Sequence, residues 1–324
     1  GDMLAIFLKT VPFFALIGLG YGAVRIRFFP EAATAALTKF VFYFALSAML
    51  FRFSANLTLA QIWDPAYVLA YLLGTTAVYL VVTLVASLRR RSVAEMAVEA
   101  QCGAIGNVGF LGIPMLTLLL GAEAIGPIML CLSVDLIVFG SLIVILVTGS
   151  RGGGLRPAIL GVVALGLLKN PMIVAIALGL LVSALALPIP DPVNAFLEML
   201  GAAATPGALF AIGASLASKS AERVAVAGWL SAAKLLIHPA LVAGSGLYLF
   251  EVDPYKLGVM IAAASLPVAG NVYILAQHYG VAPQRVSASI LISTAASVAL
   301  PAKPSRKTRA SWARTGCSAS AKPG

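Results

Sequence analysis

Two short apolar stretches place an asparagine beside glycines and a proline, a combination that can interrupt a helix and bind a solute. They read GNVGFLGIP at 106–114 and LPVAGNVYILAQ at 266–277. An asparagine carboxamide can donate to a carboxylate or accept from a cation without the cost of a buried charge. The candidate binding residues in the two stretches are Asn107, Asn271, Tyr273 and Gln277.

The glycines and prolines predict that each stretch unwinds inside a membrane helix, because proline lacks an amide hydrogen and glycine permits open dihedral angles. An unwound backbone is tolerated in hydrocarbon only where it is buried in protein or lines a cavity. Half-helix N-termini there offer partial positive charge to an anion, and freed carbonyls can bind a cation. The alternative is that the glycines only pack helices and the proline only kinks one. Recurrence of Gly-Asn-Val at 270–272 favours a binding site.

Ionisable side chains at membrane depth are costly and therefore mark candidate sites. Asp135 lies in the middle of an apolar segment, where it could carry a coupling proton or sodium ion or could pair with Lys234. Glu99 follows Glu95 by one helical turn, which favours ion pairing of both with the arginines at 89–91 over an ion-path role. The candidates for ion coupling are Asp135, Gln277 and Glu99.

These side chains must be positioned by membrane helices, because 60% of the residues are apolar, 10% are charged and the mean hydropathy is +1.00. A membrane-spanning helix needs about 20 predominantly apolar residues. The sequence predicts ten spans, at 4–24, 34–53, 65–87, 94–119, 123–148, 170–187, 193–217, 225–249, 256–279 and 285–301. The expected fold class is an all-α polytopic membrane protein.

The distribution of charge predicts the orientation of these spans. Lysine and arginine gather in the loops after odd-numbered spans, which indicates an N-terminus outside, in the periplasm of a bacterium with the protein in its inner membrane. Ten spans would return the C-terminus to that side. Residues 303–324 carry six of the 22 basic residues and predict a disordered tail rather than a nucleic-acid module. The three cysteines lack metal-site spacing.

The two halves of the chain predict an internal repeat. AMLFRFSANL (48–57) matches GALFAIGASL (207–216) at a shift of 159 positions, and Gly-Asn-Val recurs in the fourth span of each half. The expected units are 1–149 and 170–302, joined by a cytoplasmic linker at 150–169. Because each unit has five spans, an odd number, the second enters the membrane from the opposite side, so the repeats are inverted.

Four stretches resemble the auxin efflux carrier family, which includes plant PIN carriers and bacterial permeases described as malate or malonate transporters. The stretches are GNVGFLGIPML (106–116), LKNPMIVAIALGLLVSALALPIP (168–190), TPGALFAIGASL (205–216) and LPVAGNVYILAQHYG (266–280). The resemblance extends from about residue 4 to about residue 300. It implies a fold like that of bile-acid symporters and sodium/proton antiporters.

The resemblance also implies how the spans divide. Spans 1, 2, 6 and 7 would form a scaffold, and spans 3–5 and 8–10 a transport domain that moves like an elevator, with broken helices 4 and 9 crossing at the substrate site. By position, the resemblance implies that Asn107 and Pro114 belong to the first crossing helix and Pro267, Gly270 and Asn271 to the second. Together with Gly109 and Tyr273 from the same two stretches, these are the expected substrate-binding residues. Gly18 and Gly22 form a G-x-x-x-G pattern typical of close helix packing, which could include a homodimer contact of the scaffold.

The leading hypothesis is a secondary transporter of small organic anions such as carboxylates. The chain lacks the G-x-x-x-x-G-K-[ST] motif of ATP-driven proteins, so energy would come from a proton or sodium gradient or from the substrate gradient, with no cofactor. An intramembrane enzyme is an alternative, but there is no H-E-x-x-H motif, and Ser231 with Lys234 is a weak nucleophile–base pattern. A channel is a further alternative, which a closed helix crossing disfavours.

Overall fold

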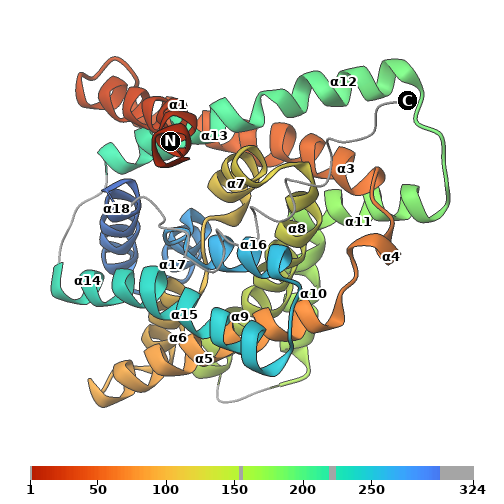
Figure 1. The fold of residues 1–324 in the computed structure, drawn as a ribbon. Helices are drawn as coiled ribbons and strands as arrows, with labels where there is room; N and C mark the ends of the chain where they lie inside the picture. The colour runs from red at the N-terminus through yellow and green to blue at the C-terminus, as the bar shows by residue number, and fades with distance from the viewer. Residues whose placement is uncertain (1, 153–155, 219–223, 300–324) are drawn as a thin grey trace.

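Nearly all of the described backbone is helical, because membrane segments must satisfy their amides and carbonyls without water. The computed structural model describes residues 2–152, 156–218 and 224–299 (Figure 1). The α-helices are α1 (Asp2–Arg25), α2 (Glu31–Phe40), α3 (Leu46–Ala55), α4 (Leu59–Ile62), α5 (Pro65–Leu88), α6 (Val93–Ala104), α7 (Ile113–Leu120), α8 (Ile125–Val134), α9 (Gly140–Arg151), α10 (Ala158–Lys169), α11 (Pro171–Ala184), α12 (Asp191–Ala202), α13 (Ala204–Ala217), α14 (Val224–Ala232), α15 (His238–Gly244), α16 (Pro254–Ala264), α17 (Gly270–Tyr279) and α18 (Pro283–Ala299). The predicted tail at 303–324 lies outside the described residues.

Short π-helical or 3₁₀ turns join or flank several of the α-helices. These turns are Val41–Ala45, Val108–Gly112, Ala122–Ala124, Asp135–Phe139, Ala233–Ile237 and Ser245–Leu249. Within the described residues, five continuous helices are long and apolar enough to cross a membrane, namely Glu31–Ala55, Pro65–Leu88, Ala122–Arg151, Asp191–Ala217 and Val224–Leu249. The protein is therefore an all-helical, multi-pass membrane protein, and five of the predicted spans are confirmed by length and composition.

The other predicted spans are also helical, three as single helices and two as broken ones. The segments 4–24, 170–187 and 285–301 correspond to α1, α11 and α18. The segments 94–119 and 256–279 are each divided, the first into α6 and α7 and the second into α16 and α17.

The predicted linker at 150–169 is largely a helix rather than a loop. Residues 153–155 lie outside the described residues, but α10 follows, is apolar, and meets α11 at a bend of 72°. Pro171 produces this bend, since a residue before proline is disfavoured in helical conformation, and Asn170 has an extended ψ of 113°. The Asn170 side chain then accepts from the amides of Met172 (3.0 Å) and Ile173 (3.4 Å), which caps α11. Counted as one bent span, α10 and α11 give a sixth candidate.

The helices pack in two groups, each of which combines both halves of the sequence. In the first helix group, α1, α2 and α3 pack with α11, α12 and α13; Figure 1 shows α1, α3, α12 and α13 along the top of the view. In the second helix group, α5, α6, α8 and α9 pack with α14, α15, α16 and α18, and α5, α6, α9, α14 and α15 occupy the lower part of that view.

Two close glycine contacts in the first helix group have matching geometry. A methyl group on Gly20 of α1 would lie 2.0 Å from the carbonyl oxygen of Phe210 on α13. A methyl group on Gly179 of α11 would lie 2.6 Å from the carbonyl oxygen of Phe51 on α3. Gly20 and Gly179 are 159 positions apart, as are Phe51 and Phe210. This shift equals the one found between the two halves of the sequence.

The G-x-x-x-G pattern of α1 makes no close helix contact among the described residues of this chain, so a homodimer contact through it stays a prediction. A methyl group placed on Gly18 or on Gly22 would meet no atom of a neighbouring described helix within 4 Å. Gly20, which lies between them, contacts α13 closely. The α1 contact within the chain therefore uses Gly20, on the opposite side of the helix from the predicted pair.

Replacing Gly20 by alanine is expected to lower the free energy of unfolding by about 1–3 kcal/mol, because the new methyl group would push α1 away from the backbone of α13. Gly22→Ala on the same helix is the matched control, since nothing opposes its methyl group. Thermal unfolding of the detergent-solubilised variants checks this prediction. Equal melting temperatures for the two variants would contradict the close packing.

Candidate functional site

Two extended segments cross at the centre of the second helix group. Residues 105–107 lie between α6 and the π-helical turn that leads into α7, and residues 265–269 lie between α16 and α17. They form an isolated antiparallel β-bridge between Gly106 and Val268. The two broken helices therefore contact each other at their interruptions.

Backbone hydrogen bonds stabilise this crossing. The Asn107 amide donates to the Pro267 carbonyl at 2.9 Å, and the Ala269 amide donates to the Ile105 carbonyl at 3.1 Å. Each unwound segment thus satisfies polar groups of the other, as a hydrocarbon environment requires.

A small cavity lies beside the crossing. Its volume is about 20 Å³, room for about one ordered water molecule. Residues at the N-terminal ends of α17 and of the helical segment after Asn107 line it, so the positive ends of two helix dipoles lie beside the same space. The lining residues are Ile105, Gly106, Asn107, Gly109, Phe110, Leu132, Asp135, Leu136, Met172, Ala269, Gly270 and Asn271.

The cavity brings together part of the predicted site. The cavity is lined by Asn107 and Gly109 next to the first break and by Gly270 and Asn271 next to the second. Asp135 lines it from the π-helical turn between α8 and α9. The Asn271 Oδ1 atom is buried and accepts no hydrogen bond from any described residue. A carboxamide with a free acceptor therefore borders the cavity.

Three predicted substrate-binding residues do not line the cavity. Pro114 lies in the first turn of α7, and Pro267 contributes its carbonyl to the crossing. Tyr273 lies further along α17, two residues after Asn271 and on another face. The side chain of Gln277, an ion-coupling candidate, lies outside the described residues.

Asp135 is held by a tyrosine that the sequence did not single out. Its Oδ1 atom accepts a hydrogen bond from the Tyr71 hydroxyl at 2.8 Å, and its Oδ2 atom accepts none from the described residues. Tyr71 stands in an apolar run of α5, where an aromatic residue is expected to pack rather than to donate, so no pattern indicated this role.

Lys234 lies against the crossing but does not form an ion pair with Asp135 in the part of the chain that the structure describes. The Lys234 side chain is fully buried, and its Nζ atom donates to the carbonyl of Ala264, the last residue of α16. An ammonium group is favourable at this negative end of a helix. A methyl group on Gly106 would lie 3.1 Å from Nζ, so glycine gives the lysine close access to the crossing.

His238, one turn after Lys234, is packed rather than exposed to the cavity. Its Nε2 atom hydrogen-bonds the Thr75 hydroxyl at 2.9 Å, and its ring lies 6.0 Å from that of Tyr71. His238 is therefore a hydrogen-bonded core residue.

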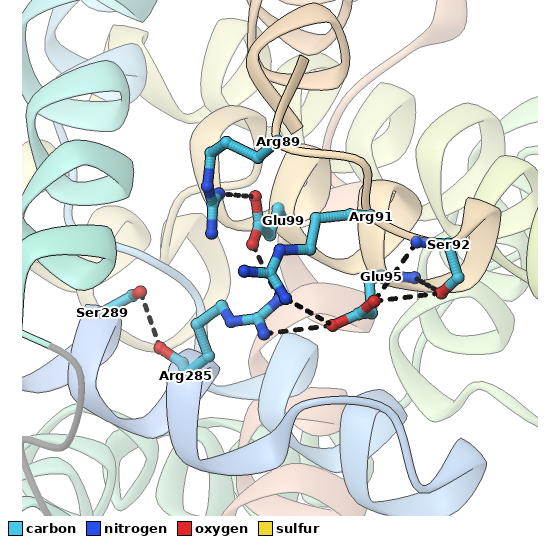
Figure 2. Close-up of polar contacts among 7 residues, drawn as sticks. All are labelled: Arg89, Arg91, Ser92, Glu95, Glu99, Arg285 and Ser289. Carbon is cyan, nitrogen blue, oxygen red and sulfur yellow. Dashed lines mark hydrogen bonds and ion pairs between the residues drawn. The ribbon is translucent and has the colours of Figure 1, made fainter. Parts of the chain in front are cut away.

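Glu99 lies away from the cavity in a buried charge cluster, shown in Figure 2. Its carboxylate accepts from Arg89 at 2.8 Å and from Arg285 at 2.7 Å. Arg285 also bonds Glu95 at 3.1 Å, and Arg91 lies 3.8 Å from Glu95. Pairing of both glutamates with the arginines at 89–91 is therefore confirmed, and Arg285, 186 positions from Glu99, is a further partner.

A mainly apolar cavity with a few polar side chains, lying between two broken membrane helices, is an arrangement typical of solute carriers. Residues 5–302 match the family described as "Membrane transport protein". The chain is 34% identical over 303 residues to a protein of Rhizobium meliloti (strain 1021) named "Putative malonate transporter", a match covering 90% of this chain and 92% of that protein. The chain therefore belongs to this membrane transport family, that of the auxin efflux carriers, and is a transporter rather than an enzyme.

Proposed function

We propose that this protein is a secondary transporter of small organic anions, in particular dicarboxylates such as malonate, and that the anion binds at the crossing. The observation that carries this proposal is the convergence of two helix N-termini and of Asn107 and Asn271 on one cavity. Helix N-termini and carboxamide donors favour a carboxylate without a fixed cation in the bilayer. The name of the Rhizobium meliloti relative supports the same substrate class.

The architecture we propose has ten spans in two inverted repeats, 1–149 and 170–302, with the helix-containing linker 150–169 between them. The matched contacts of Gly20 and Gly179 support it, since a shared shift of 159 positions is what a pseudo-two-fold axis between repeats produces. The first helix group would be the scaffold and the second the transport domain, moving against it as an elevator.

We further propose a proton as the coupling ion, carried by Asp135. The carboxylate borders the cavity, and one of its oxygens accepts no hydrogen bond from the described residues, so a proton there would remove a costly buried charge. Sodium is less suitable as the coupling ion, because the carbonyl that could bind it is occupied. The Lys234 ammonium donates to the Ala264 carbonyl at the C-terminal end of a broken helix, which is where a cation would bind.

The orientation we propose places the N- and C-termini outside a bacterial inner membrane. Arg89, Arg91 and Arg285 lie together at one end of the second helix group, and the positive-inside rule assigns such an end to the cytoplasm. A homodimer through the first helix group remains part of this proposal.

Uptake of labelled malonate into proteoliposomes tests the proposed function. The purified protein should accumulate malonate above the level of protein-free liposomes, and the label recovered from the lumen should be chemically unchanged. A panel of unlabelled mono- and dicarboxylates as competitors then defines the substrate class. Uptake no greater than in protein-free liposomes, for every carboxylate and under either ion gradient, would contradict the proposal.

Replacing Asp135 by asparagine should abolish accumulation of malonate driven by an inward proton gradient, because the amide cannot take up and release a proton. Exchange of external for internal malonate should persist, since it needs no net proton movement. The two rates are measured in the same proteoliposomes, with and without the gradient. Uphill accumulation by Asp135→Asn would reject the coupling role.

A further inference from the structure

The cavity at the crossing is closed by a residue from the other helix group. Met172 stands in the first turn of α11, is only 3% exposed, and lines the cavity. A methyl group on Gly109 would lie 3.3 Å from the Met172 Cε atom and 3.4 Å from its Sδ atom. The methionine side chain thus rests directly on the crossover backbone, where no side chain of residue 109 intervenes.

The backbone of Met172 is held from both directions. The Asn170 side chain accepts from the Met172 amide at 3.0 Å, and Pro171 stiffens the bend before it. Further along α11, Gly179 packs against the backbone of α3. A methyl group added to Gly179 would lie 2.6 Å from the Phe51 carbonyl oxygen. Relative motion must therefore come from the second helix group, or from the methionine side chain.

The space left by Met172 is too small for a dicarboxylate, since about 20 Å³ accommodates about one water molecule. Phe110, which also lines the cavity, stacks on Phe42 of the first helix group with ring centroids 6.1 Å apart and planes at 8°. The first helix group thus provides Met172, which lines the cavity, and Phe42, which packs behind the lining residue Phe110.

We propose that Met172 is the gate of this site and sets the size of the anion that is carried. A solute enters when the crossing moves away from Met172, and the volume of the methionine then limits what can be enclosed when the two groups close again. Methionine suits this position because its unbranched side chain fills irregular space and adopts several rotamers. This inference rests on the proposed function and adds a selectivity determinant to it.

Size selectivity tests the gate. Met172→Ala should raise the ratio of ethylmalonate to malonate uptake in proteoliposomes by about tenfold, the selectivity that a change of about one or two methylenes in an apolar pocket supplies. Leu178→Ala on α11 is the matched control, because Leu178 is exposed on the outer face and its truncation should leave the ratio unchanged. An unchanged ratio in Met172→Ala, with malonate uptake retained, would overturn the gate and leave the proposed function intact.

A labelling experiment covers the case in which Met172→Ala does not fold. Met172→Cys is made with alanine at the three native cysteines, Cys102, Cys131 and Cys317, and its reaction with a small maleimide is timed with and without malonate. Malonate should change the labelling rate severalfold, because binding displaces the crossing from the gate. The gate is overturned if malonate stabilises the wild-type protein against heat but leaves the labelling rate of Met172→Cys unchanged. If the wild-type protein neither binds nor transports malonate, the proposed function and the gate are overturned together.

Discussion

Replacing Arg285 by glutamine is expected to lower the free energy of unfolding by about 3–5 kcal/mol, the cost typical of removing one partner from a buried ion pair. Arg285 donates to Glu99 at 2.7 Å and to Glu95 at 3.1 Å, and Glu99 is fully buried. With the guanidinium gone, Arg89 is the one charged partner of the Glu99 carboxylate left among the described residues. Denaturant-induced unfolding of the detergent-solubilised protein measures the loss.

Two further variants separate the buried pair from a general charge effect. Arg90→Gln is the matched control, because Arg90 is exposed beside the same cluster and should change stability little. The double variant Glu99→Gln, Arg285→Gln removes both charges and should recover part of the loss. If Arg285→Gln unfolds at the same denaturant concentration as Arg90→Gln, the cluster does not join α6 to α18 in the way described.

Asn271→Ala is expected to reduce malonate uptake by about 100-fold or more, because a site built to hydrogen-bond its substrate loses far more than the energy of one contact when the polar group is removed. Asn107→Ala should have a comparable effect from the other crossing segment. The carboxamides line the cavity at the two helix N-termini, and the Asn271 Oδ1 atom is not engaged by any described residue. Initial rates of labelled malonate uptake in proteoliposomes give the comparison.

Asn56→Ala serves as the control for loss of an asparagine as such, since Asn56 is exposed at the end of α3. All three variants should keep the elution profile and melting temperature of the wild type within a few degrees. Uptake by Asn271→Ala and Asn107→Ala at the rate of Asn56→Ala would remove both residues from the substrate site.

The helical segments could be predicted from the sequence because apolar length is a local property. The prediction of a span at 65–87 corresponds to α5 at Pro65–Leu88, and the break at Gly106 and Asn107 follows from residue types that disfavour a continuous helix. Helix α10 was missed, because the glycines and arginines before it resemble a loop and its apolar run is too short to count as a span.

The residues around the cavity were predictable where a pattern recurred or, for Asp135, where a charge stands in an apolar segment. Asn107 and Asn271 stand in the same triplet in both halves, and the structure places both on one cavity. Met172 and Tyr71 have no such signal, since a methionine or tyrosine in an apolar helix is ordinarily a packing residue, and their contacts depend on how distant helices meet. The pairing of Glu99 with Arg285 is likewise set by tertiary structure alone.

The most direct measurement is the location of the bound anion. A crystal structure of the protein with bromomalonate should show the anomalous signal of bromine beside the crossing, between Asn107 and Asn271, with Met172 displaced from Gly109. Signal at any other place in the protein, with the crossing unoccupied at saturating bromomalonate, would contradict the claim that this crossing is where the transported anion binds.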